Sequence, residues 1–257
     1  MKRVSSGMAT ARFVDTLRIL VTVFTPTIAK GVIKRRSSME ALAERRDLDH
    51  KAVLLMQHLR RRYGDGPLYL ALPFRPQVLL LDAAHVAEVL AGVPTPFSPA
   101  SREKRSALIH FEPGNVLISS PARRSELRPL HEHALATGER VHPLVERFRR
   151  IIVEEIDEHL PVDGEITQIG WGDFSETWFR IVRRIVLGDG AHDDNALTSV
   201  LDDLRRRANW AFAIPTNKRK LKNFQNRLAD YLEQLEPGTL ISRFPRDRHF
   251  EPESQVA

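Results

Sequence analysis

Apolar residues recur at helical spacing along most of the chain, and only one short stretch alternates in the manner of β-strands. Helices are predicted over residues 39–63, 83–90, 121–136, 143–160, 171–187, 195–213 and 218–235. Residues 68–72 and 77–81 predict two short strands, and the proline-bounded link between them predicts a hairpin. Strands do not alternate with helices, so a doubly wound parallel sheet is not expected. The predicted fold class is therefore mainly α with a small β-sheet.

Residues 13–33 form the most apolar part of the N-terminal region, but Asp15, Arg18 and Lys30 interrupt them and Pro26 lies inside. A bilayer-spanning helix needs about 20 consecutive apolar residues. The segment therefore predicts an amphipathic helix pair around Pro26 and not a membrane span. Its apolar side has two interpretations: it packs on the rest of the protein, or it lies in a membrane interface.

The organisation predicted from this pattern is an N-terminal amphipathic segment, residues 1–38, followed by one larger domain, residues 39–257. The first residues carry no convincing signal peptide. We therefore expect a cytoplasmic protein, and a peripheral membrane contact is a further expectation that the amphipathic segment raises.

A long connection runs from Gly92 to Ser120 and begins with several prolines. Connections of this length are usually functional or disordered. This one is rich in large apolar residues, which favours an ordered, partly buried loop. From residue 121 onward the pattern is almost entirely helical.

Composition narrows the chemistry. The chain has 257 residues, of which 42% are hydrophobic and 28% charged, so it can bury a core. Because it contains no cysteine, disulfides, zinc–thiolate sites, iron–sulfur clusters and thiol nucleophiles are excluded. The formal net charge of +6 suits a nucleic acid, an anionic membrane or an acidic protein. A general bias towards arginine explains the charge equally well. No glycine-rich phosphate-binding motif occurs.

The best candidate for ligand binding is the pair Arg124 and Arg128. Residues four apart lie on the same face of a helix, and guanidinium groups bind carboxylates through charge-assisted, bidentate hydrogen bonds. A ligand with two carboxylates, such as haem, suits this pair, although a solvated surface pair would have the same spacing. Pro129 removes a backbone hydrogen bond from the same helix and is expected to bend it.

Three other groups of residues could suggest a binding site, but each has an ordinary structural interpretation. His131 and His133 are two apart, which is not the spacing of a zinc-binding helix. Glu146 and Arg149 are interpreted as a surface ion pair. The basic run 218–222 lies near aromatic residues, which suits a nucleic acid or a membrane surface, but also a solvated helix start. No catalytic residue and no metal ligand is predicted.

The order of elements resembles the N-terminal half of a bacterial cytochrome P450. The stretch 97–108, then His110-Phe-Glu-Pro, then Val116-Leu-Ile-Ser, leads directly into Arg124-x-x-x-Arg128. This order is similar to the B–C loop and C helix of that family. The predicted hairpin resembles its first β-sheet, and residues 141–235 resemble helices D to G. The resemblance implies a partial P450 fold, helices A to G with the first hairpin, without the C-terminal catalytic half.

The resemblance also implies site residues and partners. Arg124 and Arg128 match the positions that bind haem propionates, so haem is the implied cofactor. Apolar residues expected near a substrate are Leu108, Ile109, Phe111, Trp210 and Phe212. The implied partners are an apolar small molecule and an electron-transfer redox partner, and no nucleic acid.

The function expected from the resemblance is that of a haem-dependent monooxygenase, present as a truncated fragment. The family's activity depends on a cysteine thiolate ligand to iron, and this chain has no cysteine, so the fragment alone is expected to be inactive. The alternative is a helical module that binds protein or nucleic acid and has no enzymatic activity.

Overall fold

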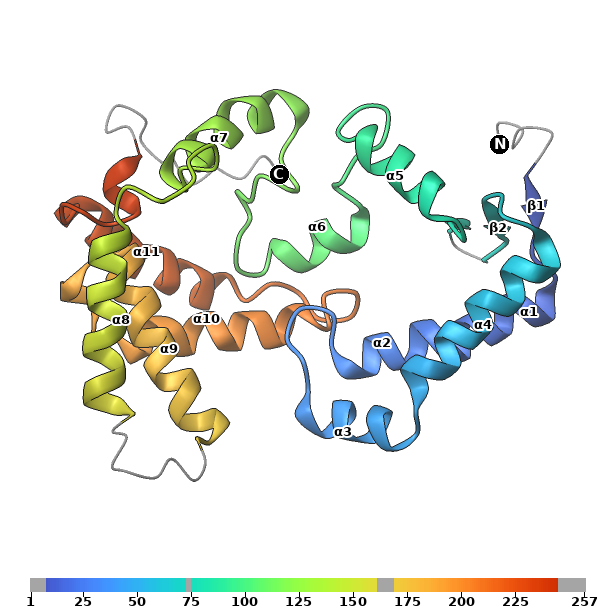
Figure 1. Ribbon diagram of the computed structural model, residues 1–257, viewed down its shortest axis with the longest axis horizontal. Coiled ribbons are helices and arrows are strands. Elements are labelled where there is room, and N and C mark those ends of the chain that lie inside the picture. Colours follow the sequence, from blue (N-terminus) through green and yellow to red (C-terminus); the bar gives the residue numbers. More distant parts are fainter. Residues whose placement is uncertain (1–7, 73–74, 161–168, 245–257) are drawn as a thin grey trace. The chain divides into compact units, whose positions relative to one another are not determined.

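The computed structural model describes residues 8–72, 75–160 and 169–244 and divides the chain into two compact units, Met1–Ser101 and Arg102–Ala257 (Figure 1). The predicted boundary at residue 38 falls inside helix α3 (Ser37–Arg45), within the first unit. The predicted class, mainly helical with one small sheet, is confirmed.

The first unit begins with a continuous helical stretch and continues with two helices that pack against it. These elements are α1 (Phe13–Ile19), a π-helical turn η1 (Leu20–Phe24), α2 (Thr25–Lys30), α3 (Ser37–Arg45) and α4 (Leu48–Tyr63). Pro26 is the second residue of α2 and follows directly after the π-helical turn η1. The single helix predicted over residues 39–63 is wrong, because Asp47 adopts a left-handed conformation, with φ of 51°, and separates α3 from α4.

The sheet has three strands in the order β1 (Ala9–Thr10), β2 (Leu68–Leu70) and β3 (Gln77–Leu79). β2 and β3 are antiparallel, which confirms the predicted hairpin. β1 pairs with β2 in parallel and was not predicted, since two residues carry no periodic signal. After β3, Asp82 caps the predicted helix α5 (Ala83–Ala91) and accepts a 2.8 Å hydrogen bond from the backbone N–H of Ala84.

An apolar core holds the sheet and the helices of the first unit together. Its fully buried members are Ala11, Ile19, Leu59, Leu68 and Leu70. One carboxylate lies beside it: Asp15 is 1% exposed and accepts a 2.7 Å hydrogen bond from the hydroxyl of Tyr63. The carboxylate of Asp15 also lies 3.4 Å from Arg62, so the buried side of α1 binds the unit through both apolar packing and polar contacts with α4.

The second unit is helical throughout its described part. Its elements are α6 (Arg102–Leu108), α7 (Pro121–Ala134), α8 (Val145–His159), α9 (Trp171–Val186), α10 (Asn195–Ala208), α11 (Lys218–Gln234) and the 3₁₀ turns η2 (Asp189–Ala191) and η3 (Ile241–Arg243). Five of these helices were predicted with ends shifted by a few residues. α6 was not, because it lies inside the connection interpreted as a loop.

Two helix pairs organise this unit, α8 with α9 and α10 with α11 (Figure 1). Ile151 and Ile181 are buried on the first pair, and Leu204 and Phe224 on the second. α6 packs against α10, and α7 against η3. No helix among the described residues is long and apolar enough to cross a membrane.

Candidate functional site

The loop between α6 and α7 is held in one conformation by its own polar groups. The side-chain oxygen of Asn115 accepts a 2.8 Å hydrogen bond from the backbone N–H of Leu117. The backbone carbonyl of Asn115 accepts another from the backbone N–H of Ser119. Ile118 is buried, and Ser120 caps α7 by accepting from the N–H of Arg123. The expectation of an ordered, partly buried loop is confirmed, and the loop fixes where α7 begins.

Arg124 and Arg128 lie four residues apart on α7, but they have different partners. Arg124 is half-buried and donates from Nη1 to the carbonyl oxygen of Val116 at 3.3 Å. Arg128 is 57% exposed and pairs through Nε with Glu132 at 2.7 Å. The α-helix runs through Pro129 to Ala134. Neither arginine is committed to a buried carboxylate, so both guanidinium groups can exchange their present partner for a ligand.

The five predicted substrate residues are divided between two segments of the second unit. Phe111 is buried and Leu108 half-buried, whereas Ile109, Trp210 and Phe212 are exposed. The rings of Trp210 and Phe212 lie 5.9 Å apart, just after α10. Since α6 packs against α10, the structure brings the end of α6 close to the helix from which these two aromatics follow.

His110 lies in the same region and is almost completely buried, with an exposure of 1%. Burial lowers the pKa of its imidazole, and the positive charge of Arg207 on α10 lowers the pKa further. Among the residues that the structure describes, its Nδ1 has no hydrogen-bond partner. The neutral ring therefore acts as a packing residue between the α6–α7 loop and α10.

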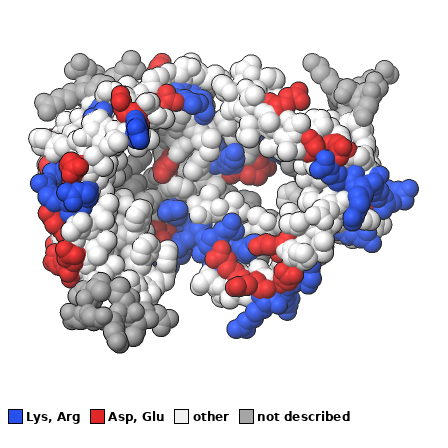
Figure 2. Space-filling model, viewed as in Figure 1, with Lys and Arg blue, Asp and Glu red and all other residues white. Residues whose placement is uncertain are grey.

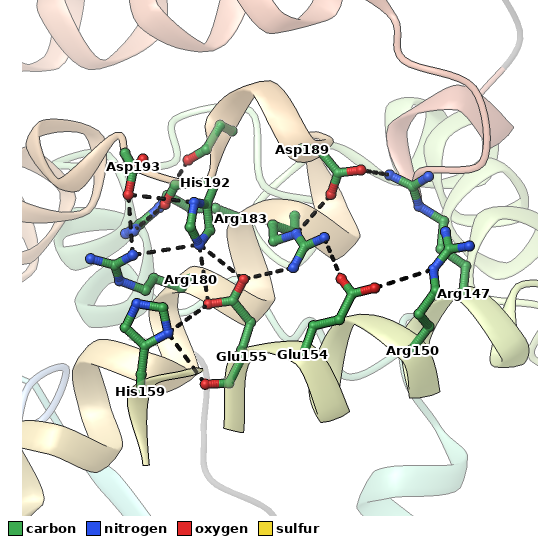
Figure 3. A network of polar contacts seen from close by, with 12 residues as sticks. Arg147, Arg150, Glu154, Glu155, His159, Arg180, Arg183, Asp189, His192 and Asp193 are labelled. Atoms are coloured by element: carbon green, nitrogen blue, oxygen red, sulfur yellow. Dashed lines mark hydrogen bonds and ion pairs between the residues drawn. The ribbon is translucent and has the colours of Figure 1, made fainter. Parts of the chain in front are cut away.

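A second constellation, which the sequence analysis did not identify, lies on α8 and α9 (Figure 3). Its centre is the guanidinium of Arg184, which binds three carboxylates at 2.7 Å each: Glu155 through Nη1, Glu154 through Nη2 and Asp189 through Nε. Burial alone would lower the pKa of Arg184, but these hydrogen bonds outweigh it and raise the pKa. Arg184 thus stays charged and ties α8 to the turn after α9.

Glu155 is the buried member of this constellation, with an exposure of 1%. Besides Arg184, two histidines contact its carboxylate. The Nε2 atom of His192 lies 2.9 Å from Oε1 and 3.2 Å from Oε2. The Nδ1 atom of His159 lies 3.5 Å from Oε2. One carboxylate, two imidazole nitrogens and a guanidinium therefore lie close together. Of these groups, the side chains of Glu155, His159 and His192 could hold a metal ion.

The network extends from Asp189 to the end of α11. Arg147 reaches Asp189 at 3.2 Å and Glu236 at 2.6 Å. Burial raises the pKa of Asp189, but Arg184 and Arg147 outweigh that effect and hold it below its usual value. Gly188 has φ of 118°, and a Cβ there would lie 2.2 Å from a carboxylate oxygen of Glu236. The turn after α9 therefore requires glycine for two reasons, its backbone conformation and this close approach.

Arg183 is 2% exposed and is bound without any ion pair closer than 4 Å among the described residues. It donates to the carbonyls of Ala191 and His192, to Thr198 and to the side chain of Asn195, at 2.6–3.0 Å. Burial lowers its pKa, and the nearby charge of Arg180 lowers it further. These bonds fix the backbone of His192 and therefore help to position the imidazole that contacts Glu155.

Sequence reasoning missed this constellation because its members come from distant segments. Only one signal was present: Glu155 and His159 are four apart and so lie on one helix face. The residues that were singled out lie elsewhere. Glu146 and Arg149 form the exposed ion pair that was predicted, 3.3 Å apart, and Lys220 of the basic run pairs with Asp203.

Comparison of the chain with protein-family models, with curated proteins and with solved structures finds no significant match.

Proposed function

We propose that this chain is the N-terminal part of a haem-dependent monooxygenase of the cytochrome P450 type, in which α7 binds the haem propionates. The observation that carries the proposal is the position of Arg124 and Arg128. Both arginines lie on α7, four residues apart, and an ordered, partly buried loop precedes this helix. A ligand can replace the present partner of each arginine. The resemblance of residues 97–128 to the B–C loop and C helix supports the same assignment.

The residues present fit one part of a haem site. A guanidinium that now donates to the carbonyl of Val116 can donate to a propionate without leaving a buried charge unpaired. The exposed pair of Arg128 with Glu132 contributes little stability, about 0–1 kcal/mol, so its exchange is easy. The axial thiolate cannot come from these 257 residues, which contain no cysteine. When bound, the haem would supply oxygen activation, and this chain would supply binding and orientation.

The apolar residues at the end of α6 and after α10 are assigned to the substrate side of the same site. Leu108 and Phe111 are sufficiently buried to hold the loop in place. Ile109, Trp210 and Phe212 keep exposed surface that an apolar molecule would cover. Covering this surface would favour binding by roughly 25 cal/mol for each Å² removed from water.

The test is a haemin titration of the 257-residue chain, followed by Soret absorbance. The Arg124→Ala, Arg128→Ala double variant should bind haemin at least tenfold more weakly than the unmodified chain, since charge-assisted hydrogen bonds contribute about 1.5–3 kcal/mol each when partly buried. Arg149→Ala is the matched control, because Arg149 is an exposed arginine on α8 with an ordinary ion pair. The reduced carbon monoxide complex should show no thiolate-type spectrum. Equal haemin affinity in the double variant and the unmodified chain would contradict the role of α7.

A second activity, binding to an anionic membrane surface, is favoured by one observation in the first unit. Along α1, η1 and α2 an exposed apolar stripe recurs at intervals of three or four residues, with exposures from 37% to 80%. Its members on these helices are Phe13, Leu17, Val21, Phe24 and Ile28, and the exposed Val32 follows after Gly31, which ends α2. The opposite side of the same helices packs on the core through Ile19 and Val23. The stripe is therefore the outer face of an amphipathic segment.

Basic residues accompany the stripe in a way that suits anionic lipid. Arg18 and Arg35 are both more than half exposed. Figure 2 shows a basic patch at the C-terminal end of α4, whose last turn carries Arg60, Arg61 and Arg62, and α4 packs beside α1 and η1. Apolar side chains with flanking cations are the composition of interfacial helices. This arrangement supports a membrane-surface contact of the kind that the amphipathic segment predicts.

Vesicle co-sedimentation tests this second proposal. The unmodified chain should sediment with vesicles of 30% phosphatidylserine and much less with neutral phosphatidylcholine vesicles, and salt should weaken the binding. Phe13→Ser with Val21→Ser should reduce the bound fraction several-fold, whereas Leu90→Ser, an exposed apolar residue of α5, should not. If the double variant binds as well as the Leu90→Ser control, the stripe is not the membrane contact.

A further inference from the structure

We propose that Glu155, His159 and His192 form a binding site for a divalent transition-metal ion with the ligand preference of Zn²⁺. The site is separate from α7 and does not depend on the haem proposal. It rests on one carboxylate oxygen and two imidazole nitrogens that already lie close together on α8 and after η2 (Figure 3).

The two distances from Glu155 to the imidazole nitrogens are close to those between ligands of a tetrahedral ion. The Oε2 atom of Glu155 is 3.2 Å from Nε2 of His192 and 3.5 Å from Nδ1 of His159, and all three atoms lie within 4.8 Å of one another. In a tetrahedral zinc site with bonds of about 2.0–2.2 Å, two ligand atoms are separated by roughly 3.3–3.5 Å. Nδ1 of His159 also lies 3.3 Å from the backbone carbonyl oxygen of Glu155, a contact that an ion at this position would replace.

The surrounding residues orient these ligands in the way that metal sites require. Arg184 donates to Oε1 of Glu155 at 2.7 Å, which fixes the carboxylate and leaves Oε2 for an ion. Asp193 lies 3.4 Å from Nδ1 of His192, on the opposite side of that ring from the nitrogen that faces Glu155. A carboxylate behind a histidine ligand sets its tautomer and raises its basicity. The backbone of His192 is anchored by the buried Arg183.

Chain topology also favours a defined site. Glu155 and His159 are one turn apart on α8, so both project from the same face. His192 comes from the turn that Arg184 and Asp189 tie to that helix. All three residues belong to the second unit, and two of them keep partial exposure, 22% for His159 and 25% for His192. Solvent can therefore reach the site and supply a fourth ligand, since three protein ligands leave one position open.

Two positive neighbours oppose a cation, Arg184 on the Glu155 carboxylate and Arg180 beside His192, and Arg180 sharpens the test. The Nη1 atom of Arg180 lies 3.4 Å from Nε2 of His192, the nitrogen that would bind the ion. Arg180 has other partners, Asp193 at 3.1 Å and Glu176 at 3.6 Å, which can hold it when it moves aside. Its charge still repels the ion, so removing it should strengthen metal binding. In a purely structural hydrogen-bond network, removing Arg180 would have no such effect.

The experiment is calorimetric titration of Zn²⁺ into the metal-free full chain at pH 7.5, with Co²⁺ as a spectroscopic probe. We expect one ion per chain and a visible cobalt spectrum of tetrahedral type. His159→Gln and His192→Gln should each weaken Zn²⁺ binding at least tenfold, and His133→Gln, an exposed histidine on α7, should leave it unchanged. Arg180→Ala should strengthen binding several-fold.

The variants are first checked for native helical content and thermal midpoint without metal, so that a loss of folding is not counted as a loss of ligand. In a folded variant, Zn²⁺ should raise the thermal midpoint of the unmodified chain and of His133→Gln, but not that of His192→Gln. The proposal is overturned if both ligand variants bind Zn²⁺ as tightly as the unmodified chain, or if Arg180→Ala weakens binding.

Discussion

Each of the two units of this protein is stabilised internally by a different kind of interaction. In the first unit the buried centre is apolar, with Leu59, Leu68 and Ile19 at its heart and one paired carboxylate beside it. In the second unit, the contact of α8 with α9 and the turn after it combines buried apolar residues, Ile151 and Ile181, with a network of arginines and carboxylates around Arg184. An apolar core tolerates shape-conserving exchange of its members, whereas a buried charge depends on one specific partner.

The comparison predicts its largest effect at Arg184. Arg184→Met should destabilise the second unit by about 3–5 kcal/mol, because it leaves Glu155 buried without a guanidinium partner. Urea denaturation followed by circular dichroism measures this loss. Arg149→Met, which removes an exposed pair, should change the stability by less than about 1 kcal/mol. If both variants lose similar amounts of unfolding free energy, the network around Arg184 stabilises the protein no more than a surface ion pair does.

A somewhat smaller effect is expected in the first unit. Leu59→Ala should destabilise it by about 2–4 kcal/mol, since Leu59 is fully buried in the apolar core and its truncation leaves a cavity. Leu59→Met should lose less, because the volume is nearly conserved. Limited proteolysis shows which of the two units is destabilised, and for Leu59→Ala we expect cleavage to increase within the first unit. Equal sensitivity of both substitutions would mean that this core is not closely packed.

The smallest effect concerns pH and His110. Its pKa in the folded protein is held below the ordinary value near 6.5, so the unfolded chain takes up the proton first. This contribution to stability is complete above pH 6.5 and is lost as the pH falls through the folded pKa. Between pH 7 and pH 5 the unmodified protein should therefore lose more stability than His110→Leu, by on the order of 1 kcal/mol. Parallel pH profiles for the two proteins would show that His110 is not the responsible group.

The parts of the fold predicted from sequence are those written in local patterns. The hairpin, α5 with its Asp82 cap and α7 to α11 follow from short-range periodicity and turn residues. What was missed depends on tertiary contacts: β1 exists because β2 lies beside it, and α6 packs against α10 although its own sequence is short and charged. The break at Asp47 needs a left-handed residue that periodicity does not reveal.

For the candidate sites the division is the same. Arg124 and Arg128 were found because both belong to one helix, where a spacing of four has a direct geometric meaning. The cluster around Glu155 was not found, because His192 is 37 residues away and Arg184 is 29 residues away along the chain. No short-range pattern records that these residues meet, and only the packing of α8 against α9 and the turn after it brings them together.

The contact of Arg147 with Glu236 has a consequence for the order of folding. The two residues are 89 positions apart, so the whole of the chain from α8 to α11 must be arranged before the pair can form. Long-range contacts of this kind are made after local helices, because closing a long loop costs entropy that later contacts repay. Weakening the pair should therefore accelerate unfolding and leave the folding rate nearly unchanged. We therefore expect the pair to stabilise the folded unit without contributing to its nucleation.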